Sequence, residues 1–278
     1  MKRFLILIVL VLAGCGEQSP EEMIKQVNSS GTISDEQAES LSKVMDLDLN
    51  GLTSITDEQA ESLSQVGSSS EIYPGILHLN GLNAITDKQA KSLSRVEYLY
   101  LNGLTSITDQ QAESLSQVEY LYLNRLTSIT DEQAGSLSKV EDLGLNGLTS
   151  ITDEQAGSLS KVETLHLNAL ATITDEQAES LSKVEYYVEL NGLTSITDEQ
   201  AEILSKGHWL SLDGLTSITD EQAESLSKVE YYVELNGLTS ITDEQAASLS
   251  KVNVVVSEAC QKLVDKHNAA NIDTNIGL

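Results

Sequence analysis

Hydrophobic positions along the chain follow two different periods that alternate within a short unit. Over residues 96–102 (VEYLYLN) every second position is core-forming, which predicts a short strand whose Leu99 and Leu101 face inward. Residues 103–107 (GLTSI) predict a turn that returns two apolar side chains to the same core. From residue 108 onward, apolar residues recur at intervals of three, as on one face of a helix. The unit is therefore predicted to be strand, turn and helix.

The helix start is specified by several residues acting together. Thr108 is a suitable N-cap, and Gln111 three residues later would close a capping box. Ile107 before the cap and Ala112 after it are spaced as a hydrophobic staple. Asp109 lies in the first turn, where the helix dipole favours negative charge. The phrase ITDQQA is thus largely a signal to begin a helix.

This phrase, I-[ST]-D-x-Q-A, recurs along nearly the whole chain. The copies begin 22 or 23 residues apart, except for one interval of 30 that holds an insertion near residues 67–74. Such a period predicts a solenoid, in which each unit buries its apolar face against its neighbours. An all-β solenoid is the alternative, but DEQAESLSK favours a helix. The copies begin at Ile33, Ile55, Ile85, Ile107, Ile129, Ile151, Ile173, Ile196, Ile218 and Ile241.

The pattern V-x-x-L-x-L-x-x-L-x-x-I-T-D-x-x-A-x-x-L, which covers residues 33–256, resembles leucine-rich repeats. The I-T-D step most resembles their cysteine-containing subclass. The resemblance implies an α/β leucine-rich-repeat solenoid with a parallel sheet on one face and short helices on the other. It also implies protein–protein recognition as the function. A structural or adhesive envelope component, and a carbohydrate-binding protein, are the competing interpretations.

The chain departs from the family at one position of the repeat. Where the family has Asn or Cys, this sequence has Leu, so the usual asparagine ladder is expected to be missing there. The Asn of each LNG triplet lies two residues earlier, where we expect a side-chain hydrogen-bond ladder on the outward face of the sheet. The leucines concerned are Leu52, Leu104, Leu126, Leu148, Leu170, Leu193, Leu215 and Leu238.

The first fourteen residues have the form of a secretory signal. Lys2 and Arg3 precede an apolar run over residues 4–12 that is too short to span a membrane. Residues 12–15 (LAGC) resemble the bacterial lipobox. The resemblance implies that residues 1–14 are removed and that Cys15 is lipidated, which would anchor the protein to a membrane of the bacterial cell envelope, outside the cytoplasm. An ordinary cleaved signal followed by a chance cysteine is the alternative.

The rest of the chain divides into three predicted segments. Residues 15–32 contain Pro20 and no repeat, and are expected to be a tether with a short helix around residues 21–27. Residues 33–256 form the solenoid. Residues 257–278 are expected to be a capping helix and tail that cover the last repeat. The insertion near residues 67–74 is expected to be a loop, and either a neutral insertion or a binding loop fits it.

Charge narrows the range of partners. The formal net charge is -27, which argues against binding to nucleic acid or to anionic lipid surfaces. Hydrophobic residues make up 40% of the chain, which is too many for a disordered acidic segment. The net charge and the hydrophobic content together fit a folded, soluble protein whose acidic surface makes neighbouring molecules repel one another.

Outward positions of parallel strands should stack into columns about 4.8 Å apart. Seven aromatic residues fall in two of these columns and form two predicted patches: Tyr98, Tyr100, Tyr120 and Tyr122, and then Tyr187, Trp209 and Tyr232. They could be a ligand-binding strip or cross-strand pairs that merely stabilise the sheet. Two repeats carry an extra residue, so a register shift that exchanges Tyr187 for Tyr186 is a further alternative.

No catalytic or cofactor motif appears in the sequence. His78 and His166 share a column but would lie on the order of 19 Å apart, too far for one metal ion. There is no nucleophile elbow and no phosphate-binding loop. The ten repeated Asp residues, from Asp35 to Asp243, are expected to cap helices rather than to bind calcium. We therefore predict a non-enzymatic protein without a cofactor or a metal.

The lipobox gives the first prediction. Cys15→Ala should abolish labelling of the protein by a radioactive or clickable fatty acid, because the sulfur that receives the lipid is lost. Growth of the producing cells with the labelled fatty acid and purification of the protein measure this directly. Labelling that persists in the variant would contradict the assignment of Cys15.

Overall fold

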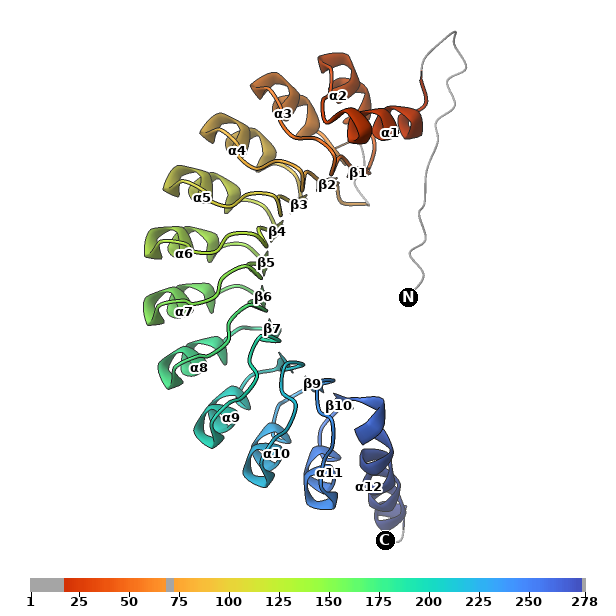
Figure 1. Ribbon diagram of the computed structural model, residues 1–278, viewed down its shortest axis with the longest axis vertical. Coiled ribbons are helices and arrows are strands. Elements are labelled where there is room, and N and C mark those ends of the chain that lie inside the picture. The colour runs from red at the N-terminus through yellow and green to blue at the C-terminus, as the bar shows by residue number, and fades with distance from the viewer. Residues whose placement is uncertain (1–17, 69–72, 277–278) are drawn as a thin grey trace.

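The computed structural model describes residues 18–68 and 73–276, and side chains as far as residue 269. Within this range ten strands form one parallel sheet, paired in chain order from β1 to β10. Figure 1 shows that the units follow an arc, with the sheet on the concave side and the repeat helices on the convex side. The arrangement is the α/β solenoid that the sequence predicts.

The elements are short and regular. The strands are β1 (Asp46–Asp48), β2 (Ile76–His78), β3 (Tyr98–Tyr100), β4 (Tyr120–Tyr122), β5 (Asp142–Gly144), β6 (Thr164–His166), β7 (Tyr187–Glu189), β8 (Trp209–Ser211), β9 (Tyr232–Leu235) and β10 (Val254–Val256). The helices are α1 (Pro20–Ser30), α2 (Asp35–Leu41), α3 (Asp57–Leu63), α4 (Asp87–Leu93), α5 (Asp109–Leu115), α6 (Asp131–Leu137), α7 (Asp153–Leu159), α8 (Asp175–Leu181), α9 (Asp198–Leu204), α10 (Asp220–Leu226), α11 (Asp243–Leu249) and α12 (Glu258–Ile276).

Each helix from α2 to α11 begins with the predicted capping box. In α5 the Gln111 backbone N–H donates to the Thr108 hydroxyl at 3.0 Å, and the Thr108 backbone N–H donates to the Gln111 side-chain oxygen at 3.0 Å. Two backbone donors that the first helical turn would leave unpaired are satisfied in this way. The prediction for the helix start is confirmed.

The capping glutamine also links neighbouring repeats, a role that the sequence pattern does not predict. While its Oε1 accepts from the Thr of its own repeat, its Nε2 donates to the Ile carbonyl of the preceding repeat; for Gln111 and Ile85 the distance is 2.8 Å. The same bond links every consecutive pair of repeats from α2–α3 to α10–α11. In seven junctions the Thr hydroxyl also donates to the Asp of the preceding repeat. We call the glutamine bonds the glutamine ladder.

On the sheet side, the asparagine ladder takes the form that the sequence predicts. The Asn102 backbone N–H donates to the Asn80 side-chain oxygen at 2.9 Å, and Asn124 repeats this bond to Asn102 at 3.0 Å. Equivalent bonds run without a break from Asn50 to Asn236, with an aspartate at one step. The leucines at the family's Asn or Cys position are fully buried, so that position serves the apolar core instead.

The N-terminal end corrects the predicted tether. Residues 20–30 form helix α1, with Val27 fully buried and Met23 nearly so, and α1 packs beside α2 and β1 (Figure 1). Asn28 donates to the Asp48 carbonyl at 2.9 Å and accepts from the Gly51 N–H at 2.8 Å. The described part of the segment is therefore a cap on the first repeat. Residues 15–17 lie outside the described range.

At the other end, α12 covers the last repeat. Cys260 and Val264 are buried, and the Ser257 hydroxyl donates to the carbonyl of Leu238 in the repeat before it. The insertion leaves the sheet undisturbed, because Ile76 pairs with Asp46 in regular register. Its residues 69–72 lie outside the described range.

The glutamine ladder can be tested with an isosteric change. Gln155→Glu keeps the capping acceptor but loses the donor to the Ile129 carbonyl, which lies 2.9 Å away in a buried position. We expect the free energy of unfolding to fall by about 1–3 kcal/mol. Urea unfolding followed by circular dichroism measures the change.

Gln37→Glu is the matched control. Gln37 closes the capping box of α2, but its Nε2 reaches only the exposed Gln26 side chain at 3.4 Å. Its replacement should change the stability by no more than a few tenths of a kcal/mol. Equal effects of the two substitutions would show that the bond between repeats contributes nothing.

Candidate recognition face

The outward columns of the sheet have the register that the sequence predicts. Tyr98 pairs with Tyr120, and farther along Tyr187 pairs with Trp209 and Trp209 with Tyr232. The alternative that exchanged Tyr187 for Tyr186 is therefore wrong. The extra residue of the longer repeats is accommodated before the strand, not within it.

In the first patch the aromatic rings lie on one another. Tyr98 and Tyr120 have ring centroids 3.9 Å apart and planes 5° apart, and Tyr100 and Tyr122 have centroids 4.5 Å apart and planes 4° apart. His78 extends the second stack, 4.2 Å from Tyr100. All five side chains are half-buried. The ring faces are occupied by neighbouring rings, which fits the interpretation of cross-strand pairs that stabilise the sheet.

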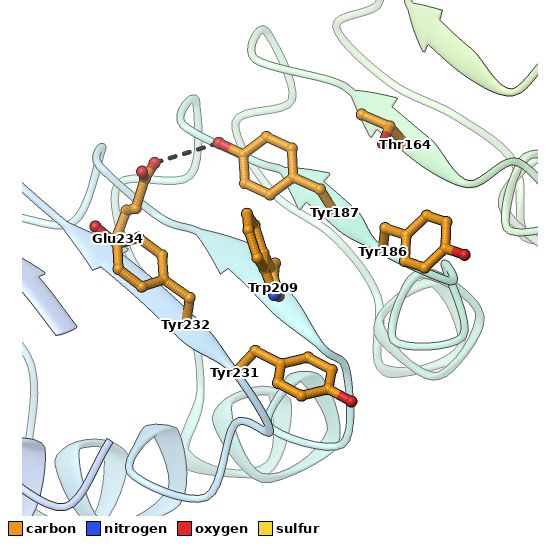
Figure 2. A pocket seen from close by; sticks show the side chains of 7 residues that line it. All are labelled: Thr164, Tyr186, Tyr187, Trp209, Tyr231, Tyr232 and Glu234. Carbon is orange, nitrogen blue, oxygen red and sulfur yellow. Dashed lines mark hydrogen bonds between the residues drawn. The ribbon is translucent and has the colours of Figure 1, made fainter. Parts of the chain in front are cut away.

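The second patch is open. Trp209 projects between Tyr187 and Tyr232, from the middle one of three neighbouring strands (Figure 2). It is 49% exposed, and its ring centroid lies 6.0 Å from that of Tyr232 with the planes tilted by 46°. A hollow of about 670 Å³ lies here, which we call the aromatic hollow; it is lined by Thr164, Tyr186, Tyr187, Trp209, Tyr231, Tyr232 and Glu234.

Two of these lining residues were missed by the sequence analysis. Tyr186 and Tyr231 are 54% and 52% exposed and stand just before strands β7 and β9. They are the first tyrosines of the two EYYVELNG segments, so the extra residue of the longer repeats brings an additional ring to the surface. The doubled tyrosine was the available signal.

Between the two patches lies a polar cluster centred on His166. Its Nδ1 lies 2.5 Å from a Glu189 carboxylate oxygen, and its Nε2 lies 3.2 Å from Asp142 Oδ1. The Tyr122 hydroxyl donates to the other Asp142 oxygen at 2.9 Å. Gly144 makes room for this bond, because an added Cβ there would lie 2.5 Å from the Tyr122 ring. The sequence pattern suggests only a metal-ligand role for His166, which it then excludes, and does not predict this cluster.

The cluster holds the imidazole charged. Burial lowers the pKa of His166, but hydrogen bonds to Asp142 and Glu189, together with their charges, outweigh burial and raise that pKa to about 9. The same contact with His166 lowers the pKa of Glu189. Among the described residues, no group of three or more His, Cys, Asp or Glu side chains is arranged to hold a metal ion. The cluster is therefore an ion-pair network within the sheet surface.

The predicted lipidation site lies outside the described residues, as Cys15 belongs to the segment 1–17. Of the helices in the described ranges, none combines the length and the apolar composition needed to cross a membrane.

Comparison with known proteins places the fold. No family description and no curated protein matches the sequence. Among solved structures, an internalin (inlF) of Listeria monocytogenes is similar at a TM-score of 0.50 and 16% identity, over 85% of this chain and 74% of the internalin. A second, internalin C2 from the same organism, has a TM-score of 0.44 and 16% identity over 84% of this chain and 92% of that one.

The fold is a leucine-rich-repeat solenoid. The first likeness, the single parallel sheet and the strand–helix repeat agree on this. At 16% identity the likeness concerns the fold alone, so the residues of the recognition face have to be interpreted from their own geometry.

The His166 cluster gives a prediction with a defined pH dependence. Because the pKa is raised from 6.5 in the unfolded chain to about 9, the ion pairs stabilise the fold fully below about pH 6.5 and lose this contribution as the pH rises through about 9. His166→Gln should therefore lower the stability by about 1–3 kcal/mol at pH 6, and by much less at pH 10.

Urea unfolding of both proteins across this pH range measures the difference. His78→Gln is the matched control, since His78 lies in the same column and 3.7 Å from Asp46, in a more exposed position. A deficit of the His166 variant that does not change with pH would contradict the charged imidazole.

Proposed function

We propose that this protein is a lipid-anchored, non-enzymatic recognition protein of the bacterial cell envelope, and that the concave sheet contacts a protein partner. The observation that carries this proposal is the contrast between the two aromatic patches. Most of the concave face is filled by its own stacks and ion pairs, whereas Trp209, Tyr186 and Tyr231 remain half exposed around the aromatic hollow. Exposed aromatic side chains clustered in this way are typical of binding surfaces.

The architecture supports such a role. A rigid array of repeats holds the rings of three different strands at fixed separations, so that binding orders little of the backbone. Tyr and Trp also contribute large contact areas with few rotatable bonds. The lipobox supports the anchored location, because a lipid on Cys15 would keep the solenoid at a membrane surface.

The role of the concave face can be tested by site-specific photo-cross-linking in the producing cells. A photoreactive amino acid in place of Tyr231 should give covalent adducts with a discrete partner, because this side chain stands at the rim of the aromatic hollow. The matched control replaces Glu221, which is exposed on the convex helix α10 of the preceding repeat. Adducts should depend on irradiation and should be absent from the control.

Two results would contradict the proposal. One is the same set of adducts from both positions, which would indicate non-specific proximity in the envelope. The other is no adduct from Tyr231 in cells that display a folded protein, which would favour a structural role without a ligand at this face.

A further inference from the structure

We infer that the aromatic hollow receives a lysine or arginine side chain from a basic segment of the partner protein. This inference rests on the proposed function and adds the chemistry of the partner. It combines two independent features of the concave face: a set of open aromatic rings, and a line of carboxylates that leads to them and has no lysine or arginine partner within the described residues.

The carboxylates stack across the repeats directly before strands β3 to β6, and one residue earlier before β7 and β9. They form what we call the glutamate row, made of Glu97, Glu119, Glu141, Glu163, Glu185 and Glu230. Backbone hydrogen bonds fix their succession: the Glu141 N–H donates to the Glu119 carbonyl at 3.0 Å, and the Glu163 N–H donates to that of Glu141 at 3.0 Å. The Tyr186 N–H then donates to the Glu163 carbonyl at 2.8 Å, so the row runs directly into the aromatic hollow.

Within the described residues, no lysine or arginine pairs with the glutamate row. Two of the nearby lysines instead pair with glutamates of the repeat helices: Lys183 lies 3.2 Å from Glu179, and Lys228 lies 3.9 Å from Glu224. Among the described residues, Glu230 is the only member of the row in an ion pair, since it lies 2.9 Å from His208. Glu185 and Glu230 also share hydrogen bonds with the neighbouring Tyr186 and Tyr231. The row is therefore a source of negative potential that the protein itself leaves uncompensated.

The carboxylates of the row act on one another. Partial burial, and then the charges of Glu119 and Glu141, raise the pKa of Glu97. Partial burial and the charges of Glu141 and Glu185 do the same for Glu163. Like charges on neighbouring strands destabilise a sheet, and a cation bound along the row would relieve this repulsion.

The aromatic hollow matches a cation at the end of that row. A lysine ammonium or an arginine guanidinium is attracted to the face of a Trp or Tyr ring within about 6 Å. Acidic groups stand beside both exposed tyrosines. The charges of Glu185 and Glu163 raise the pKa of Tyr186, and a hydrogen bond with Glu230 raises the pKa of Tyr231. A basic side chain placed among these rings would thus be neutralised by carboxylates on either side.

A neutral sugar fits the same hollow less well. Apart from tyrosine hydroxyls and the indole N–H, the polar lining consists of Thr164 and Glu234, and the Glu234 carboxylate already accepts from the Tyr187 hydroxyl at 3.2 Å. Sugars need several hydrogen bonds at fixed positions in addition to stacking, and they would gain nothing from the glutamate row.

Trp209 is the only tryptophan of the chain, so its fluorescence reports on the hollow alone. The full-length protein is titrated with a Gly-Ser peptide that carries three lysines, and with the same peptide in which the lysines are acetylated. The lysine peptide should change the fluorescence to saturation and bind about tenfold more tightly than the acetylated one. Its affinity should fall several-fold as the Debye length shortens from about 30 Å at 0.01 M salt to about 10 Å at 0.1 M.

Two variants, both of which retain Trp209 as the fluorescent reporter, separate the contribution of the tyrosines to peptide binding from that of the glutamate row. The double substitution Tyr186→Ala with Tyr231→Ala should weaken binding of the lysine peptide by about five- to thirtyfold. The triple substitution Glu163→Gln, Glu185→Gln and Glu230→Gln should weaken it and flatten its salt dependence. The matched control replaces three exposed glutamates of the convex helices by Gln, namely Glu132, Glu154 and Glu199, and should bind as the wild type does.

The remaining outcomes are decisive. Equal affinity for both peptides, or binding of an oligosaccharide of N-acetylglucosamine in place of the lysine peptide, would overturn the inference. Lysine binding that survives loss of both tyrosines would place the site elsewhere and would also overturn it. If the lysine peptide does not bind while a photoreactive residue at position 231 still gives specific cross-links in cells, the proposed function stands. Only the inference of a basic segment in the partner is then wrong.

Discussion

The structure depends on a hydrogen bond that each repeat cannot make alone. A repeat of 22 or 23 residues buries its leucines only against its neighbours, and its loop carbonyl at the Ile position is satisfied by the glutamine of the next repeat. An unpaired carbonyl in that buried position would cost about 1–3 kcal/mol per junction. This helps to explain why T-D-x-Q is repeated so closely: the Gln side chain bonds to an adjacent copy at every junction, and the Thr and Asp side chains bond to each other across seven junctions. The Ile contributes its backbone carbonyl to the glutamine bonds.

The sheet side of the repeat is less constrained. Two positions of each strand point outward and contribute to no ladder, so their side chains can differ from repeat to repeat while the leucines between them stay buried. Along the concave face these variable side chains form three different arrangements: stacked tyrosines near β3 and β4, an ion-pair network around His166, and the aromatic hollow near β7 to β9. The first two are satisfied within the protein. The third remains open to solvent.

Local patterns were sufficient for the parts of the structure that each repeat determines by itself. The strand register, the capping boxes and the asparagine ladder follow from spacing within one unit and from the stacking of identical units. The second bond of Gln111, the exposure of Tyr186 and Tyr231, and the contacts of His166 depend on side chains of the adjacent repeats, whose rotamers a sequence does not reveal. Gly144 illustrates this limit: only the structure shows that its missing side chain lets Tyr122 reach Asp142. Residues 20–30 lack the repeat pattern, so the sequence predicts a tether there, whereas the structure shows that Val27 and Asn28 of helix α1 complete the first repeat.

The packing of α1 has a mechanical consequence. If Cys15 carries the lipid, the membrane pulls on the end of the solenoid that α1 caps, and a partner held at β7 to β9 pulls on it from the other side. The load then passes in series through the junctions between β1 and β7, each held by the backbone hydrogen bonds of the sheet, one glutamine bond, one asparagine bond and a layer of leucines. Because repeats interact only with their neighbours, such a chain of junctions yields one at a time under tension. The solenoid would thus act as an extensible link, while β10 and α12, beyond the bound partner, carry no force.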